Sequence, residues 1–212
     1  MRSIQQLVFV LAVMPCTLLS ADATLIYERF EIPAKATAKG MPLDVSAEVV
    51  AHGGLLAPNR RSGTFDGSSF LNYGKDKKVA STDFTVEAFV KLSRGWIYQS
   101  IAADWREKDD NRSWALVVTP DRAIRFDISC DGTFEPGNKL ETAARLLQAG
   151  RWYHVAAVSE GTSSRIYING HKVAEKKRDV PGIYVDDTAN LTVGNVDGFA
   201  TGSPKPFFGQ LD

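Results

Sequence analysis

Short segments rich in Val, Ile, Phe, Tyr and Trp recur about every ten to fifteen residues in the last two-thirds of this chain, with turn residues between them. The turn residues include Asp131-Gly132, Gly161 and Asn169-Gly170. Helical periodicity is confined to the stretch "ETAARLLQAG". Short strands at such spacing predict an all-β fold, either an antiparallel sandwich or a barrel, with one hydrophobic core.

The stretch "FTVEAFVKL" indicates how one strand is oriented. Alternate residues of a strand point to opposite faces of its sheet. One face carries Phe84, Val86, Ala88 and Val90; the other carries Thr85, Glu87, Phe89 and Lys91. We therefore expect a strand with one face on the core and the other partly open to solvent.

The stretch "RIYINGHKV" predicts a hairpin. Asn169 and Gly170 separate two alternating segments, and an Asn-Gly loop accepts the positive φ angles that a type I′ turn requires. This motif sets strand register and predicts no chemistry.

Residues 1–23 differ from the rest and are typical of a secretory signal peptide. Arg2 supplies a positive charge, an apolar run extends from Leu7 to Leu19, and Ala21-Asp22-Ala23 forms a small-x-small cleavage pattern. The run is too short for a span of about 20 apolar residues. We expect a secreted protein, extracellular or periplasmic, with no membrane span; a retained amphipathic anchor and a lipid-attached form are the alternatives.

Charge and cysteine content narrow the function classes. Lys plus Arg and Asp plus Glu both number 25, so the formal net charge is zero and no overall field attracts nucleic acid. Beyond the predicted signal peptide Cys130 is the single cysteine, in the strand-like stretch "RFDISC". It cannot form an internal disulfide, and we expect a buried or edge thiol without a catalytic role.

Five motifs occur in a specific order from about Ser62 to Asp212: "GTFDGSSFL", "DFTVEAFVKL", "RWYHVAAVSEGTSSRIYINGHKVA", "LTVGN" and "FFGQLD". As a set they closely resemble the laminin-G-like branch of the concanavalin A-like lectin/glucanase superfamily. The resemblance implies a jelly-roll sandwich of two curved antiparallel sheets over residues 62–212. Residues 24–61 would add a leading strand and a loop to the same domain.

The resemblance also implies a mostly non-catalytic module whose relatives bind glycans or proteins and often hold calcium. Family members usually continue for a few strand residues past the closing aspartate, here Asp212. Either this last strand is short, or the sequence is part of a longer protein.

Calcium takes several hard oxygen ligands, and the resemblance implies that the first and last matched strands lie side by side. We therefore expect Asp66 of "FDG" and Asp212 of "GQLD" to form a structural calcium site. The alternative is that each carboxylate ties a turn through backbone hydrogen bonds.

The sequence lacks two catalytic motifs of hydrolases. Glycosidases of this superfamily carry Glu-x-Asp-x-Glu on one strand, so that the carboxylates face one groove. This chain has no such triplet and no Gly-x-Ser-x-Gly elbow. His154 in "WYHVAAVS" reads most simply as a structural histidine.

Sugar recognition needs an aromatic platform beside polar groups that bind hydroxyls. The residues predicted in loops or at strand ends that could supply these are Trp96, Tyr98, Trp105, Arg106 and Phe134. For each, packing in the core or at its rim is the alternative role.

The sequence thus predicts an exported, non-catalytic binding or adhesion module for carbohydrate. A glycoside hydrolase, the accessory domain of a larger extracellular enzyme, and a domain that binds an extracellular protein ligand remain alternatives.

Overall fold

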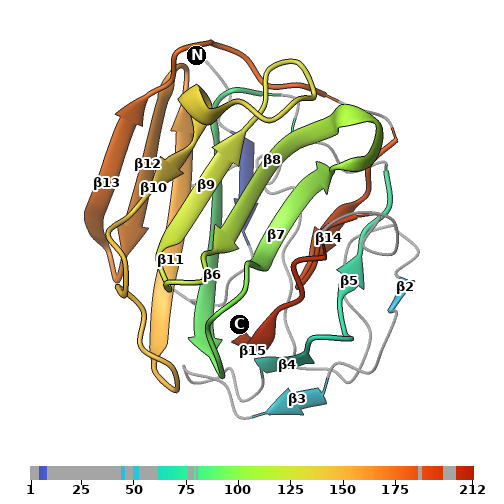
Figure 1. Cartoon of the computed structure of the whole chain (residues 1–212), viewed down its shortest axis with the longest axis vertical. Coiled ribbons are helices and arrows are strands. Elements are labelled where there is room, and N and C mark those ends of the chain that lie inside the picture. Colours follow the sequence, from blue (N-terminus) through green and yellow to red (C-terminus); the bar gives the residue numbers. More distant parts are fainter. Residues whose placement is uncertain are drawn as a thin grey trace, which may run out of the picture.

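Two β-sheets packed face to face make up the part of the chain that the computed structural model describes (Figure 1). That part comprises the strand segments 5–8, 44–45 and 50–52, and residues 62–75, 79, 81–185, 188–197 and 204–212. These residues contain no α-helix, and two short 3₁₀ turns occur, Lys108–Asp110 and Pro136–Asn138. The predicted all-β sandwich is confirmed.

The first sheet has the strand order β13-β12-β11-β6-β15-β4-β3, and β1 pairs with β6 in parallel. The other pairs in this sheet are antiparallel. Its strands are β1 (Gln5–Val8), β3 (Val50–His52), β4 (Ser62–Asp66), β6 (Phe84–Leu92), β11 (Trp152–Glu160), β12 (Ser163–Ile168), β13 (His171–Lys177) and β15 (Phe208–Leu211).

The second sheet has the order β10-β9-β8-β7-β14-β5-β2, and all its pairs are antiparallel. Figure 1 shows β7, β8 and β9 in front of β6 and β11. Its strands are β2 (Asp44–Val45), β5 (Leu71–Asn72), β7 (Gln99–Arg106), β8 (Asn111–Val118), β9 (Ile124–Ile128), β10 (Leu140–Glu141) and β14 (Leu191–Val193).

The core lies between the two sheets, and β6 shows how sequence alternation builds it. Burial alternates along β6, with Phe84 and every second residue after it buried and the residues between them partly exposed, as predicted. The Phe84 ring meets Trp114 of β8 and Phe126 of β9, with ring centroids 5.8 and 5.9 Å apart. Aromatic contacts from three strands thus join the two sheets.

The predicted Asn-Gly hairpin connects β12 to β13. Asn169 and Gly170 have φ angles of 51° and 79°, as a type I′ turn requires. Asn169 also ties the turn to β11, because its backbone N–H donates to the His154 carbonyl at 2.8 Å and its side-chain oxygen accepts from the His154 N–H at 2.9 Å. The motif has the architectural role that the sequence predicts.

Two other sequence predictions are not found in the structure, one because the segment folds differently and one because its residues are mostly not described. The stretch "ETAARLLQAG" forms no helix; it begins in β10 and continues as turns. Most of the predicted signal peptide 1–23, and the leading strand expected near residues 25–30, lie outside the described residues. No helix in the described part of the chain is long and apolar enough to cross a membrane.

Candidate functional site

A cavity of about 380 Å³ lies on the face of the second sheet that points away from the core. Strand alternation defines this face: Trp114, Leu116 and Val118 of β8 belong to the core, whereas Ala115 and Val117 belong to a separate apolar cluster. We call this cavity the outer-face pocket. Its lining residues are Tyr98, Trp105, Glu107, Arg112, Ala115, Val117, Arg125, Asp127, Phe134 and Lys205.

Small apolar side chains and one large ring form the base of the outer-face pocket. Ala115 and Val117 cluster with Ala103, Trp105 and Val196. Trp105 is only 3% exposed; its ring centroid lies 6.5 Å from that of Phe134, in an edge-to-face arrangement, and the Arg112 guanidinium lies 5.8 Å from the centre of the Trp105 ring. Trp105 therefore supports the cavity from below and offers little open surface for stacking.

An ion pair on β9 is the main polar group of the pocket. Arg125 and Asp127 are two residues apart, so they point to the same face of the strand. Arg125 Nε donates to both carboxylate oxygens, at 2.9 and 2.7 Å, and a second guanidinium nitrogen lies 2.7 Å from Oδ2.

Burial raises the pKa of the Asp127 carboxyl, while the hydrogen bonds and charge of Arg125 oppose that shift. Burial also lowers the pKa of Arg125, but the hydrogen bond and charge of Asp127 outweigh it, so that this pKa is raised overall. The close bidentate contact favours the ionised forms of both groups.

Two exposed aromatic rings flank this ion pair. Tyr98, from the loop before β7, is 39% exposed, and Phe134, from the loop after β9, is 41% exposed. The Arg125 guanidinium lies 5.3 Å from the centre of each ring. Both rings therefore make a cation–π contact with the same charged group, and both keep part of their surface open to solvent.

The other cations of the pocket already have partners. Lys205 forms an ion pair with Glu107. Arg112 pairs with Asp110 and also donates to the backbone carbonyls of Glu107 at 3.1 Å and Gly132 at 3.4 Å. The pocket is consequently polar but locally close to neutral.

Three of the five residues predicted to bind ligand come together here: Tyr98, Trp105 and Phe134. Arg106 does not line the pocket, and its guanidinium lies 3.7 Å from the Asp109 carboxylate. Arg125 and Asp127 are not among the residues predicted from the sequence. The signal was present in "IRFDI", where two charges at positions i and i+2 interrupt an apolar strand.

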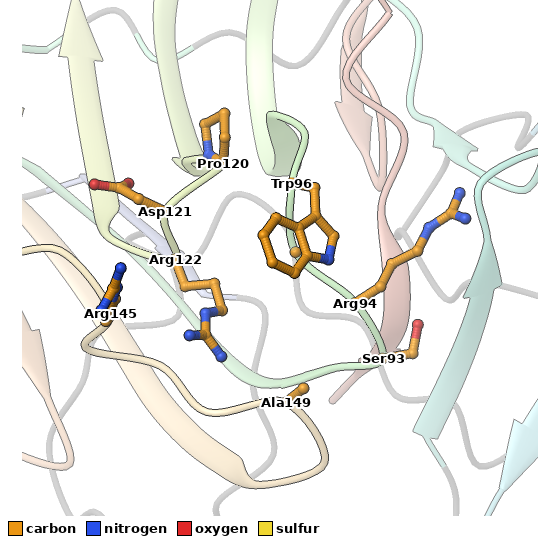
Figure 2. A pocket seen from close by; sticks show the side chains of 9 residues that line it. Ser93, Arg94, Trp96, Pro120, Asp121, Arg122, Arg145 and Ala149 are labelled. Atoms are coloured by element: carbon orange, nitrogen blue, oxygen red, sulfur yellow. The ribbon is translucent and has the colours of Figure 1, made fainter.

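Trp96 lines a second cavity, of about 660 Å³, at the ends of the strands (Figure 2). We call it the rim pocket. It is lined by Ser93, Arg94, Gly95, Trp96, Pro120, Asp121, Arg122, Arg145 and Ala149. The segment 95–98 therefore contributes Trp96 to the rim pocket and Tyr98 to the outer-face pocket.

The two aspartates expected to share calcium are not brought together. The strands that carry them do pair, but the antiparallel register sets Asp66 opposite Phe208 and Gly63 opposite Leu211, the neighbour of Asp212. Asp212 thus lies roughly 13 Å farther along the strands. The expectation of one shared Asp66–Asp212 site is wrong in its geometry.

Asp66 instead ties the turn after β4. Its Oδ1 accepts from the backbone N–H and hydroxyl groups of Ser68, at 2.8 and 2.7 Å, and of Ser69, at 3.1 and 3.0 Å. The described residues contain no group of three or more His, Cys, Asp or Glu side chains that could hold a metal. Structural calcium therefore stays a prediction, which melting curves with calcium and with chelator would test.

His154 and Cys130 both have structural partners. His154 Nε2 lies 3.2 Å from Glu87 Oε2, and its ring packs 5.0 Å from that of Phe89. Cys130 Sγ accepts from Asn138 at 3.1 Å and lies 3.4 Å from the Val180 carbonyl. Burial and the neighbouring Glu135 raise the pKa of this thiol, which disfavours the nucleophilic thiolate.

The strand order and the packing of two sheets around one core define the fold class as a β-sandwich. Residues 65–212 match the family model of the concanavalin A-like lectin/glucanases superfamily, more than two-thirds of the chain. The chain belongs to this superfamily, as the sequence motifs indicate.

Solved structures share the fold at low sequence identity. The binding domain of Paraclostridial Mosquitocidal Protein 1 matches with a TM-score of 0.61 and 16% identity, over 84% of this chain and 44% of that one. The module CBM40 of the Ruminococcus gnavus IT-sialidase matches with a TM-score of 0.54 and 14% identity, over 82% and 90%.

Domain 4 of AbnA, a GH43 extracellular arabinanase from Geobacillus stearothermophilus solved with arabinotriose, matches with a TM-score of 0.52 and 15% identity, over 84% and 82%. This chain spans 41% of the length of a matching protein from Bacteroides ovatus, as well as 44% of the mosquitocidal chain. No curated protein matches the sequence.

Proposed function

We propose that this protein is an exported, non-catalytic module that binds carbohydrate in the outer-face pocket. The observation that carries the proposal is the arrangement of Tyr98 and Phe134, two exposed rings on either side of the Arg125–Asp127 ion pair. Aromatic rings bind the C–H faces of a sugar, and charged groups between them bind its hydroxyls.

The charge balance of the pocket favours a neutral sugar. Arg125 and Lys205 each pair with a carboxylate inside the pocket, and Arg112 pairs with one at its edge. An anionic sugar would have to compete with these carboxylates. A hydroxyl can instead donate to Asp127 and accept from Arg125 without breaking the pair.

The same pairing supports a non-catalytic role. A retaining glycosidase needs one carboxylate free to attack and a second to donate a proton. The two carboxylates of this pocket, Asp127 and Glu107, are both bound to cations. This pairing disfavours either carboxylate as a catalytic acid or nucleophile, which supports the proposal.

Similar solved structures suggest how such a module could be used within a larger protein. Two similar structures are parts of named enzymes, an arabinanase and a sialidase, and one of them was solved with an arabinose trisaccharide. By analogy of fold alone, this chain would act as an accessory domain that holds a larger protein on its polysaccharide. Export is proposed from the basic, apolar N-terminal segment and its cleavage pattern.

A neutral glycan and polysaccharide screen tests the binding role. Tyr98→Ala and Phe134→Ala should each weaken the binding of any hit about five- to thirtyfold, since stacking of a ring on a sugar is worth about 1–2 kcal/mol. Val173→Ala, an exposed apolar residue on β13, is the matched control and should bind normally.

Two outcomes would overturn the proposal. One is a correctly folded protein that binds no neutral glycan, which would favour a protein ligand. The other is measurable release of reducing sugar by the purified chain, which would indicate a hydrolase.

A further inference from the structure

The rim pocket has no role in the proposed function, and its chemistry differs from that of the outer-face pocket. We propose that it is a second ligand site, which binds an anionic group carried on a sugar, either a carboxylate or a sulfate. Trp96 would stack on the sugar ring while Arg122 and Arg145 bind the anion.

The cations of the rim pocket are the first reason. Within the described residues, no carboxylate is hydrogen-bonded to the guanidinium of Arg122 or of Arg145. The carboxylate of the pocket, Asp121, accepts a hydrogen bond from the Thr119 hydroxyl, which is the main cause of its lowered pKa; the charge of Arg145 contributes less, without a hydrogen bond between the two side chains. Two guanidinium groups therefore keep their donors for a ligand, unlike the paired cations of the outer-face pocket.

The exposed ring is the second reason. Trp96 is 86% exposed, an unusual position for the largest apolar side chain in a soluble protein. Figure 2 shows the Trp96 indole and the Arg122 side chain extending over the same hollow, with Arg145 and Asp121 beyond Arg122. Arg94 faces elsewhere, since its guanidinium lies 3.2 Å from the centre of the Phe208 ring.

Backbone strain is the third reason. Six non-glycine residues in the described part of the chain have positive φ, and three of them line this cavity: Trp96 at 78°, Arg122 at 64° and Arg145 at 58°. Bulky residues rarely adopt this conformation. Strained residues gathered at one cavity are typical of a site where the side-chain directions matter.

Hydrogen bonds between loops hold the strained residues in place. The Trp96 N–H donates to the Pro120 carbonyl at 3.1 Å, and the Arg145 N–H donates to the Asp121 carbonyl at 2.7 Å. The Leu147 N–H donates to the Arg122 carbonyl at 3.2 Å. Three separate segments are thus fixed to one another, so that the ring and the two cations are arranged before a ligand arrives.

Three polymers test the site with the folded protein. Dextran sulfate carries sulfate, polygalacturonate carries carboxylate, and unmodified dextran is the uncharged control for the first. We expect binding of at least one anionic polymer, no binding of dextran through this pocket, and a decrease in affinity as salt rises from about 0.05 M to about 0.5 M. The polymer that binds identifies the anion.

Variants assign the binding to the rim pocket. Arg122→Gln/Arg145→Gln should weaken anionic binding at least tenfold, and Trp96→Ala should weaken it severalfold. Lys172→Gln/Lys177→Gln removes the same charge from exposed positions on β13 and should leave affinity within twofold. Arg122→Lys/Arg145→Lys keeps the charge and should recover part of the affinity, which separates binding from loss of fold.

The inference is overturned if no anionic polymer binds, or if the two double glutamine variants lose affinity equally. Equal loss would indicate attraction by overall charge. The test is independent of the proposed function, because Tyr98→Ala and Phe134→Ala should affect neutral glycans and leave anionic binding within twofold.

Discussion

Arg125 and Asp127 form a bidentate ion pair on β9, with the carboxylate almost fully buried and the guanidinium between the rings of Tyr98 and Phe134. The ion pair holds the Arg125 guanidinium 5.3 Å from the centre of each ring. The pocket therefore contains a buried charge, the Asp127 carboxylate, that is stabilised by Arg125.

Removal of Arg125 should therefore destabilise the fold as well as the pocket. Arg125→Met leaves the buried Asp127 carboxylate without its main counter-charge, and we expect a loss of about 3 kcal/mol in the free energy of unfolding. Urea denaturation measures it. Arg125→Met/Asp127→Leu should recover most of that loss, and a single variant within about 0.5 kcal/mol of wild type would contradict the argument.

The two tryptophans of the predicted ligand set should behave in opposite ways. Trp105 is 3% exposed, so Trp105→Ala opens a cavity and should cost about 3 kcal/mol of unfolding free energy. Trp96 is 86% exposed, so Trp96→Ala should change stability by less than about 0.5 kcal/mol. Thermal melting compares them, and equal losses would show that this assignment of burial is wrong.

Alanine substitutions at two glycines should distinguish the cost of an unfavourable backbone conformation from the cost of a steric clash. Gly170 has a φ of 79°, and no atom lies within 4 Å of the place that a Cβ would occupy. Gly170→Ala should therefore lower the free energy of unfolding by about 1 kcal/mol, from backbone conformation alone. Gly209 has a φ of 150°, and its Cβ would collide with the Lys91 carbonyl oxygen. Gly209→Ala should cost about 3 kcal/mol or more, because β15 must shift away from β6. Chemical denaturation of both variants checks the order, and similar costs would contradict it.

Asp66 should make stability depend on pH in the acid range. Hydrogen bonds from the Ser68 hydroxyl and N–H, then from Ser69, lower its pKa well below the ordinary 3.8. A carboxyl with a lowered pKa stabilises the fold above its unfolded-state value, and that contribution is lost as the pH falls below about 4. The melting temperature of Asp66→Asn should be below that of wild type at pH 7, and the gap should narrow at pH 3. A gap that is constant with pH would count against this role.

The fold could be predicted from the sequence because its signals are local. Alternation along "FTVEAFVKL" and the Asn169-Gly170 turn depend only on neighbouring residues, and both are found in the structure as expected. Register between distant strands is not local. The family resemblance implies that the strands of Asp66 and Asp212 lie side by side, but not that Phe208 stands opposite Asp66.

The site was predicted in part for the same reason. Tyr98 and Phe134 lie in loops, where the sequence places exposed aromatics. The burial of Trp105 depends on Phe134 and Arg112, which come from segments after β9 and in β8 and cannot be placed beside it without the fold. Arg125 was not predicted, because the cavity over β9 is completed by residues from distant segments, such as Tyr98 and Lys205.

The segment 95–98 contributes a ring to each of two cavities, so a ligand bound at one proposed site would act on the backbone that also carries the other. A ligand that immobilises this backbone at one cavity reduces the entropy still to be lost at the other. Linkage then requires that each ligand change the affinity for the other by the same factor. A polysaccharide with neutral and acidic residues in one chain would engage both cavities at once and gain affinity from their combination.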